Sequence, residues 1–346
     1  MVAGPGSPFK VRFGVTHNEA VFRRRRMQSS IYAAETSVTA QSYDYYSECM
    51  STGSNDGRIS THRRNADNGW IEDTEQRLEQ AHDGRITSLS YSHPSYGTLL
   101  ASSSTDRTVK VWEMRQNVPR NQRMIAKFTE SKTPISALSF CSPSALQLLC
   151  ISTDGFMRIY QATIPADPTT WSCLHTIHVT SAQMHSTLNS STPSTPTHTI
   201  SVCPDKEYSG LVGVVAGCTN AVDIISYSTT NRPGIAHQLD CLTQQPLCSV
   251  AWSPGCQRGY WNVAAGARDG LVRIFKLSLS HSDDGSAPVF TSHLVAELEH
   301  GGVVASLSWN LFGTVLTSSG DNAKASVWKA SYTGLWSCHS TYSISE

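Results

Sequence analysis

Residues Ala101–Glu113 read ASSSTDRTVKVWE, and this stretch decides the fold. Small hydroxyl residues lead to Asp106, and an apolar alternation then ends at Trp112. Ser102, Ser104 and Asp106 share one face of an extended segment, because side chains alternate along a strand. The Asp-Arg pair predicts a tight turn, and the alternation after it predicts a second strand. The stretch therefore predicts an antiparallel β-hairpin.

The same pattern returns five more times along the chain. It recurs as CMSTGSNDGRISTHRR, LLCISTDGFMRIYQA, GVVAGCTNAVDIISYS, NVAAGARDGLVRIFKL and VLTSSGDNAKASVWKA. The residues at the turns are Asp56, Asp106, Asp154, Asn220, Asp269 and Asn322. Their spacings of 50, 48, 66, 49 and 53 residues are those of a repeat array. Six units follow from this count.

Each unit carries further strand signals. Six positions after each turn the sequence has a large side chain or a smaller residue in its place. These residues are His62, Trp112, Tyr160, Ser226 with Tyr227 beside it, Phe275 and Trp328. Upstream of several turns lie the alternating runs RITSLSYSHP, PISALSFCSP, LCSVAWSPG and VVASLSWNLFG. We therefore expect three strands and a linking outer strand in each unit. Such sheets bury both faces only by stacking radially, which predicts an all-β, six-bladed β-propeller.

Composition narrows the function classes. The 346 residues include 27 basic and 27 acidic side chains, so no global positive field favours nucleic acid. Apolar runs such as GLVGVVAG are too short to span a bilayer, and the N-terminus lacks the apolar core of a secretory signal. The 10 cysteines are scattered without a CxxC pair, which favours buried free thiols and a reducing compartment, the cytosol or nucleus.

Two segments stand apart from the repeats. Residues 1–35 carry the basic run Arg23–Arg26, which we interpret as a flexible solvated tail, with a nuclear-import patch and a transit peptide as alternatives. Residues 185–199 form a Ser/Thr/Pro-rich stretch that predicts a flexible connector between the third and fourth units. Thr192 and Thr195 each precede a proline, so proline-directed phosphorylation is an alternative role. The propeller is expected to span residues 36–346.

The polar residues of the second unit predict a structural network rather than an active site. His82, Ser104, Asp106 and Trp112 can form a hydrogen-bonded chain, and Tyr160, Phe275 and Trp328 hold the aromatic position in other units. His82, Ser104 and Asp106 resemble a catalytic triad only in composition, because no strained elbow or oxyanion hole accompanies the serine. GxxxxGK[ST], GxGxxG, HExxH and GxSxG motifs are absent from the sequence. We predict no catalytic residue, no cofactor and no metal.

Several stretches carry a family resemblance. The endings KVWE, RIYQ, RIFK and SVWK, with AHDGRITSLSYSHPSYGTLLASSSTDRTVKVW, are similar to a WD-repeat propeller. RIYQATIPADPTTW, SKTPISALSF and YWNVAAGARDGLVRIF resemble the Sec-thirteen-homologue nucleoporins, and the likeness covers residues 36–346. The paralogous Sec-thirteen vesicle-coat proteins are the nearest alternative. The first unit departs from the pattern by ending in STHRR, and the fourth departs by lacking the usual aromatic residue.

The resemblance implies a non-enzymatic scaffold of the nuclear pore outer-ring Y complex, in support of protein and mRNA transport. An α-solenoid nucleoporin that donates a blade in trans, and other Y-complex subunits, are the implied partners. The implied location is the nuclear envelope, with a nutrient-signalling coat complex at the lysosome or vacuole as a second setting. After Trp328 the sequence has one more strand-like piece near residues 336–341, so we expect an open ring. A secretory vesicle coat subunit is the alternative function, and a propeller enzyme or peptide-reading adaptor represents another class.

Overall fold

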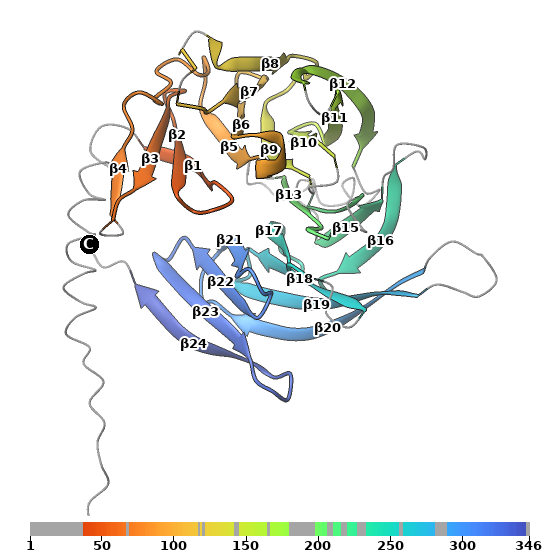
Figure 1. The fold of residues 1–346 in the computed structure, drawn as a ribbon. Coiled ribbons are helices and arrows are strands. Elements are labelled where there is room, and N and C mark those ends of the chain that lie inside the picture. Colours follow the sequence, from red (N-terminus) through yellow and green to blue (C-terminus); the bar gives the residue numbers. More distant parts are fainter. Residues whose placement is uncertain are drawn as a thin grey trace, which may run out of the picture.

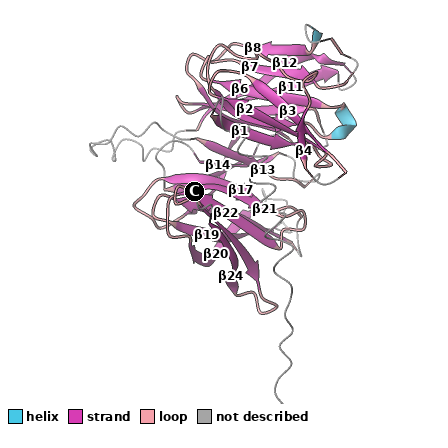
Figure 2. Ribbon diagram, turned by 90° about the vertical axis from the view of Figure 1, so that its left-hand side faces the viewer, coloured by secondary structure: helices cyan, strands magenta, loops and turns pink. Residues whose placement is uncertain are grey.

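The computed structural model is built from six four-stranded antiparallel sheets (Figure 1). It describes residues 37–66, 69–116, 118–119, 122–141, 145–164, 167–179, 198–205, 210–215, 220–226, 233–255, 259–280 and 289–343. The side view shows strands throughout, with helix confined to short turns such as the 3-10 helix η1 (Pro94–Tyr96) (Figure 2). The prediction of an all-β, six-bladed WD-repeat propeller is confirmed.

Each sheet uses four strands that are consecutive in the chain. Blade 1 consists of β1 (Val38–Tyr43), β2 (Cys49–Ser54), β3 (Ile59–Arg64) and β4 (Trp70–Glu72). Blade 2 consists of β5 (Ile86–Tyr91), β6 (Leu99–Ser104), β7 (Val109–Glu113) and β8 (Met124–Phe128). Blade 3 consists of β9 (Ile135–Phe140), β10 (Gln147–Ser152), β11 (Phe156–Ile164) and β12 (Asp167–His178).

The second half of the ring repeats this order. Blade 4 consists of β13 (Thr199–Val202), β14 (Leu211–Val215), β15 (Ala221–Ser226) and β16 (Gly234–Asp240). Blade 5 consists of β17 (Leu247–Trp252), β18 (Tyr260–Ala267), β19 (Leu271–Ser280) and β20 (Val289–Glu299). Blade 6 consists of β21 (Val304–Trp309), β22 (Val315–Gly320), β23 (Lys324–Ala330) and β24 (Trp336–Ser343).

The first strand of each blade lies innermost. Contacts between neighbouring blades run from β1 to β5, then to β9, β13, β17 and β21. The last strand of each blade lies at the outer rim (Figure 1). Because every sheet is completed by its own consecutive strands, no sheet among the described residues joins the two ends of the chain.

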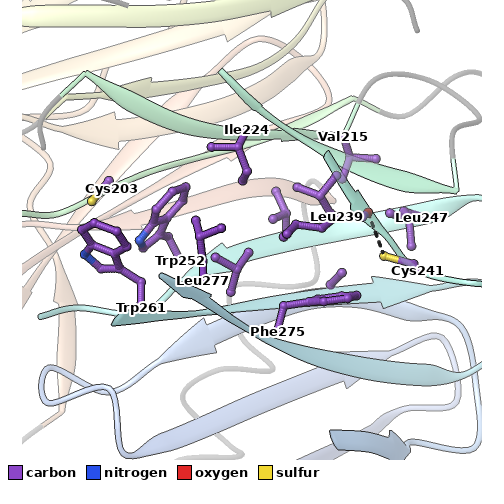
Figure 3. Close-up of a cluster of buried hydrophobic side chains, with 14 of the residues drawn as sticks. Cys203, Val215, Ile224, Leu239, Cys241, Leu247, Trp252, Trp261, Phe275 and Leu277 are labelled. Carbon is purple, nitrogen blue, oxygen red and sulfur yellow. Dashed lines mark hydrogen bonds between the residues drawn. The ribbon is translucent and has the colours of Figure 1, made fainter. Parts of the chain in front are cut away.

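The core is divided into five apolar clusters, and each fills one boundary between successive blades. One cluster joins blades 1 and 2, the next joins blades 2 and 3, and the others follow in order to blades 5 and 6. The cluster between blades 4 and 5 contains Trp252, Trp261 and Phe275, which interleave with apolar residues of both sheets (Figure 3). Burial of this apolar area is the main stabilising contribution to the ring.

Two glycines let neighbouring blades approach closely. A Cβ atom on Gly53 of β2 would lie 2.5 Å from Cγ2 of Ile86 in blade 2. A Cβ atom on Gly266 of β18 would lie 2.5 Å from Cγ1 of Val304 in blade 6. Both positions therefore need a residue without a side chain, because a packed interior leaves no space for another carbon atom.

Several sequence predictions concern residues that the structure does not describe. Residues 1–35, with Arg23–Arg26, and most of 185–199, with Thr192 and Thr195, lie outside the described part. All cysteines within the described part are free thiols. The expectation of burial is wrong for Cys173 and Cys338, which are exposed on the outer strands β12 and β24. Among the described helices, none has the length and apolarity needed to cross a bilayer.

Candidate protein interface

The polar network of blade 2 connects three parts of the sheet. His82 lies in the connection before β5, and its Nδ1 is 2.9 Å from Oδ2 of Asp106 in the β6–β7 turn. The Nε2 atom of His82 is 2.7 Å from Oγ of Ser102 on β6. Nε1 of Trp112 on β7 donates to the same hydroxyl at 2.8 Å. The network thus ties the loop, the turn and two strands together.

The donor inventory fixes the direction of these bonds. An ionised carboxylate only accepts, so Nδ1 of His82 carries the ring proton and donates to Asp106. In the neutral ring Nε2 is then an acceptor, so the Ser102 hydroxyl donates to it while its oxygen accepts from the Trp112 indole. Burial lowers the pKa of His82, which agrees with a neutral ring. Burial alone would raise the pKa of Asp106, but bonds from His82 and Thr108 outweigh it and hold that pKa well below its usual range.

The serine of this network is Ser102, and the expectation of Ser104 is wrong. Ser104 lies on the same face at the end of β6, where its Oγ accepts from the backbone N–H of Asp106 at 3.1 Å. Thr108 is a further member that the sequence analysis missed, because its hydroxyl donates to Oδ1 of Asp106 at 2.7 Å. The position of this threonine, two residues after the turn aspartate, is the sequence signal that could have identified it.

Blade 6 carries a reduced form of the same network. Nε1 of Trp328 donates to Oγ of Ser318 at 2.8 Å, and that hydroxyl is 2.9 Å from Nδ1 of His300. Asn322 replaces the turn aspartate, and its amide donates to the backbone oxygen of His300 at 3.4 Å. No carboxylate contacts His300 in these bonds, but the neighbouring Asp321 accepts from the backbone N–H of Val303 at 2.9 Å and so also joins the turn to the loop.

The other turn residues have local structural partners. Asp56 accepts from the backbone N–H of Arg58, and Asp154 accepts from that of Phe156. Asp269 accepts from the Thr243 hydroxyl at 2.8 Å and forms an ion pair with Arg273 at 2.8 Å. Asn220 donates to the backbone oxygen of Thr243 at 3.1 Å. These contacts close hairpins or join them to the connection between blades 4 and 5.

The aromatic positions Trp112, Tyr160, Phe275 and Trp328 all lie in apolar clusters at blade boundaries. The Tyr160 ring stacks on Phe128 with centroids 4.0 Å apart, and its hydroxyl donates to Glu130 at 2.7 Å. Phe275 is buried in the cluster between blades 4 and 5 (Figure 3). His62, the corresponding residue of blade 1, is 4% exposed, and burial lowers its pKa.

These residues do not form a reaction centre. Ser102 and Ser104 are both 0% exposed, whereas a catalytic serine must reach substrate. In the part of the chain that the structure describes, no three His, Cys, Asp or Glu side chains gather where they could hold a metal ion. The arrangement can stabilise a sheet and orient its loops. The exposed sheet faces are the surfaces that a partner could contact.

One such surface is the face of blade 6 that points away from blade 5. Pairing places Ser306, Ser319, Ala325 and Tyr342 in one row across β21 to β24, and Ser308, Thr317, Val327 and Ser340 in the next. All eight are partly or fully exposed. The opposite face of the same sheet, with Val304, Leu316 and Trp328, is buried against blade 5.

The corresponding face of blade 5 shows what such a surface normally contacts. There Ser249, Ala251, Ala264 and Gly266 are buried beneath blade 6. Small residues on one blade leave space for the larger side chains of the next blade. On its two inner strands, β21 and β22, the free face of blade 6 also carries small residues, and no described blade lies over it.

Blade 1 provides the other side of the opening. Its face away from blade 2 includes Tyr43, Met50, Thr52 and Trp70, with the Tyr43 and Trp70 rings 5.8 Å apart. Tyr43 is 46% exposed. No strands of blades 1 and 6 pack together as neighbouring blades do elsewhere in the described ring, and no apolar cluster joins them (Figure 1). Two sheet faces are thus left without a neighbouring sheet.

Comparisons with known proteins agree with this architecture. Residues 74–113 match the family model described as "WD domain, G-beta repeat". A chain from "Crystal Structure of Mitotic Checkpoint Complex" superposes with a TM-score of 0.61 at 14% identity, over 86% of this chain and 76% of that one. This likeness shows the fold.

Curated relatives align over most of the chain. Nucleoporin SEH1 of Saccharomyces cerevisiae is 29% identical, over 86% of this chain and 94% of its own length. Nucleoporin seh1 of Schizosaccharomyces pombe is 28% identical over 89% and 93%, and Nucleoporin SEH1 of Homo sapiens is 28% identical over 86% and 82%. The repeat pattern, the six blades and these alignments agree: the chain is a WD-repeat propeller that is similar over most of its length to the SEH1 nucleoporins.

Proposed function

We propose that the chain is a non-enzymatic scaffold subunit of the outer-ring Y complex of the nuclear pore, in support of protein and mRNA transport. The observation that carries this proposal is the pair of uncovered sheet faces on blades 1 and 6. In a propeller, radial stacking covers the inner faces of the sheets, so two such faces without a neighbouring sheet offer a place for a further blade. The partner that fits is an α-solenoid nucleoporin that contributes a blade in trans.

The dimensions of the surface favour an inserted sheet over a single peptide strand. The free face of blade 6 extends across all four strands, from β21 at the centre to β24 at the rim. A lone strand added to β24 would pair with the rim and leave Ser306 and Thr317 uncovered. A hairpin or three-stranded blade would cover both rows and contact Tyr43 and Trp70 of blade 1 on its other side.

Hydrogen exchange tests this proposal directly. The chain would be compared alone and after co-expression with its solenoid partner, using peptides from all six blades. Protection should rise in blades 1 and 6, because their strands become covered, while blades 3 and 4 serve as the internal control. Full protection of blades 1 and 6 in a monodisperse monomer would show that the ring is closed and would overturn the proposal.

A pull-down from native lysate separates the settings in which this surface could act. Recovery of outer-ring nucleoporins supports the Y complex, and recovery of a lysosomal or vacuolar coat complex would add the second setting. Recovery of secretory coat subunits alone would favour the vesicle-coat alternative. The matched control is a chain whose blade 6 face carries Ser319→Trp, which should release partners that enter the opening.

A further inference from the structure

We propose, on the basis of the proposed function, that the blade inserted in trans carries an aliphatic side chain that packs on Ser319 of blade 6. We further propose that its other face carries a glycine, alanine or serine that receives Val38 of blade 1. The reason lies in one contact that recurs between described blades. An aliphatic side chain from the innermost strand of one blade packs on a small residue of the second strand of the blade before it.

The innermost strands of five blades begin with an aliphatic residue in the same setting. Each of these residues pairs with the last residue of the second strand and precedes a shift in register. Ile86, Ile135, Leu247 and Val304 are at most 1% exposed, and each belongs to the apolar cluster shared with the preceding blade. Val38 has this position in blade 1, but it is 52% exposed. Val38 therefore lacks the preceding blade that buries its counterparts.

Small residues on the second strands receive these side chains. Gly53 faces Ile86, and Gly266 faces Val304, so closely that a Cβ atom on either glycine would lie 2.5 Å from the aliphatic side chain. Ser319 has the equivalent position in blade 6, since it also precedes the last residue of its second strand and lies at the register shift. Both glycines are buried, whereas Ser319 is partly exposed. Ser319 thus lies where an aliphatic side chain of a following blade would pack.

Serines of the innermost strands hold the backbone of the next blade. Oγ of Ser249 in blade 5 donates to the backbone oxygen of the first residue of β21 at 3.4 Å. Oγ of Ser90 in blade 2 accepts from the backbone N–H of Phe140 in blade 3 at 3.1 Å. Strand register places Ser306 and Ser308 of blade 6 at these two positions, and both are exposed. Blade 6 therefore offers the hydroxyl groups that align the backbone of a following blade.

Competition for a limiting amount of partner tests the two contacts. Each variant and a differently tagged wild-type chain would be co-expressed with the outer-ring solenoid nucleoporin recovered in the pull-down, and the ratio of the two chains in the complex would be measured. Val38→Ala should lower recovery about tenfold, because two methyl groups lose their contact with the inserted blade. Ser319→Val should lower it at least as much, because the added carbon atoms occupy the space of the partner's side chain. Ser319→Ala should compete as the wild type does.

The matched controls lie on exposed rim strands. They are Val289→Ala on β20, where the valine is 56% exposed, and Ser172→Val on β12. All variants should keep the wild-type melting temperature, since none of the replaced side chains is buried in the free chain.

The outcomes separate this proposal from the proposed function. If Val38→Ala or Ser319→Val competes as well as its control, a blade enters without that contact, which overturns the present proposal and leaves the proposed function standing. If no solenoid nucleoporin is recovered with the wild-type chain, both are overturned. A change in the oligomeric state of the isolated chain on Val38→Ala, measured by light scattering, would assign the contact to a second copy and would also overturn the proposal.

Discussion

His82 Nδ1 lies 2.9 Å from Oδ2 of Asp106, and this bond joins the connection before β5 to the β6–β7 turn of blade 2. The side chains come from segments separated by 24 residues. The His82 side chain is 0% exposed and that of Asp106 is 11% exposed, so water screens the bond weakly. The bond fixes the loop against the β6–β7 turn, whose counterpart recurs in every blade.

Asp106→Ala should lower the free energy of unfolding by about 1–3 kcal/mol. The change removes acceptors from His82, from the Thr108 hydroxyl and from two backbone N–H groups. Chemical denaturation of the wild type and the variant measures the difference. Asp83→Ala, at the exposed neighbouring position, is the control and should change stability by less than about 0.5 kcal/mol. Equal denaturation midpoints for Asp106→Ala and wild type would contradict the network.

Ser102→Ala should destabilise the chain more than Ser104→Ala. Loss of the Ser102 hydroxyl leaves the Trp112 indole N–H and Nε2 of His82 without their shared partner, at a cost of about 1–3 kcal/mol. Ser104 accepts one backbone bond at 3.1 Å, so its loss removes a single interaction. Thermal melts of the two variants provide the comparison. The reverse order would restore Ser104 to the network.

The sequence predicted the blades because their signals are local. Turn residues such as Asp106 and Asp269 and the alternation around them depend on neighbours a few positions away. Neighbouring residues could not decide whether Ser102 or Ser104 belongs to the network, since both serines share one face of β6. The answer depends on which serine lies within hydrogen-bond distance of the His82 ring, and the conformation of the connection before β5 determines this.

The sequence also could not show which sheet faces are left uncovered. Ser319 and Gly266 lie on the second strands of their blades, and both are small residues of the WD pattern, so the sequence does not distinguish them. Only the arrangement of blades shows that Gly266 lies against Val304, whereas Ser319 lies on a face without a described sheet over it.

Asp223→Asn should stabilise the protein near neutral pH. Asp223 is 1% exposed, and burial raises its pKa to about 6, although Gln238 donates to it at 2.9 Å. The folded chain then holds this proton more tightly than the unfolded chain, so stability falls as pH rises from about 4 to about 6. Asparagine keeps the acceptor without the charge, and the gain should be on the order of 2 kcal/mol at pH 7.5.

The pH dependence of that gain provides the check. At about pH 4 the wild-type carboxyl is protonated in the folded chain, so the difference between variant and wild type should be close to zero. Melting temperatures at pH 4, 5, 6 and 7.5 would measure the difference, with Asp83→Asn as an exposed control. A gain that is independent of pH would show that charge burial is not its cause.

Gly266→Ala should weaken the boundary between blades 5 and 6. The added carbon would lie 2.5 Å from Cγ1 of Val304 and 2.6 Å from Oγ of Ser249, so the sheets must move apart at a cost of about 1–3 kcal/mol. Gly234→Ala is the control, because a Cβ atom there has nothing within 4 Å. Denaturant titration compares the two. Similar stabilities would mean that the blades adjust without strain.

Ser319→Trp should leave the isolated chain folded and abolish partner insertion. Ser319 lies on the face of blade 6 that no described sheet covers, so a large side chain has space in the free chain and should change stability by less than about 0.5 kcal/mol. An inserted blade would meet the indole at the position where blade 6 meets Gly266 of blade 5. Co-purification with the solenoid partner measures binding, and Thr291→Trp on the exposed rim strand β20 is the size-matched control. If Ser319→Trp recovers as much partner as Thr291→Trp does, the partner does not enter between blades 1 and 6.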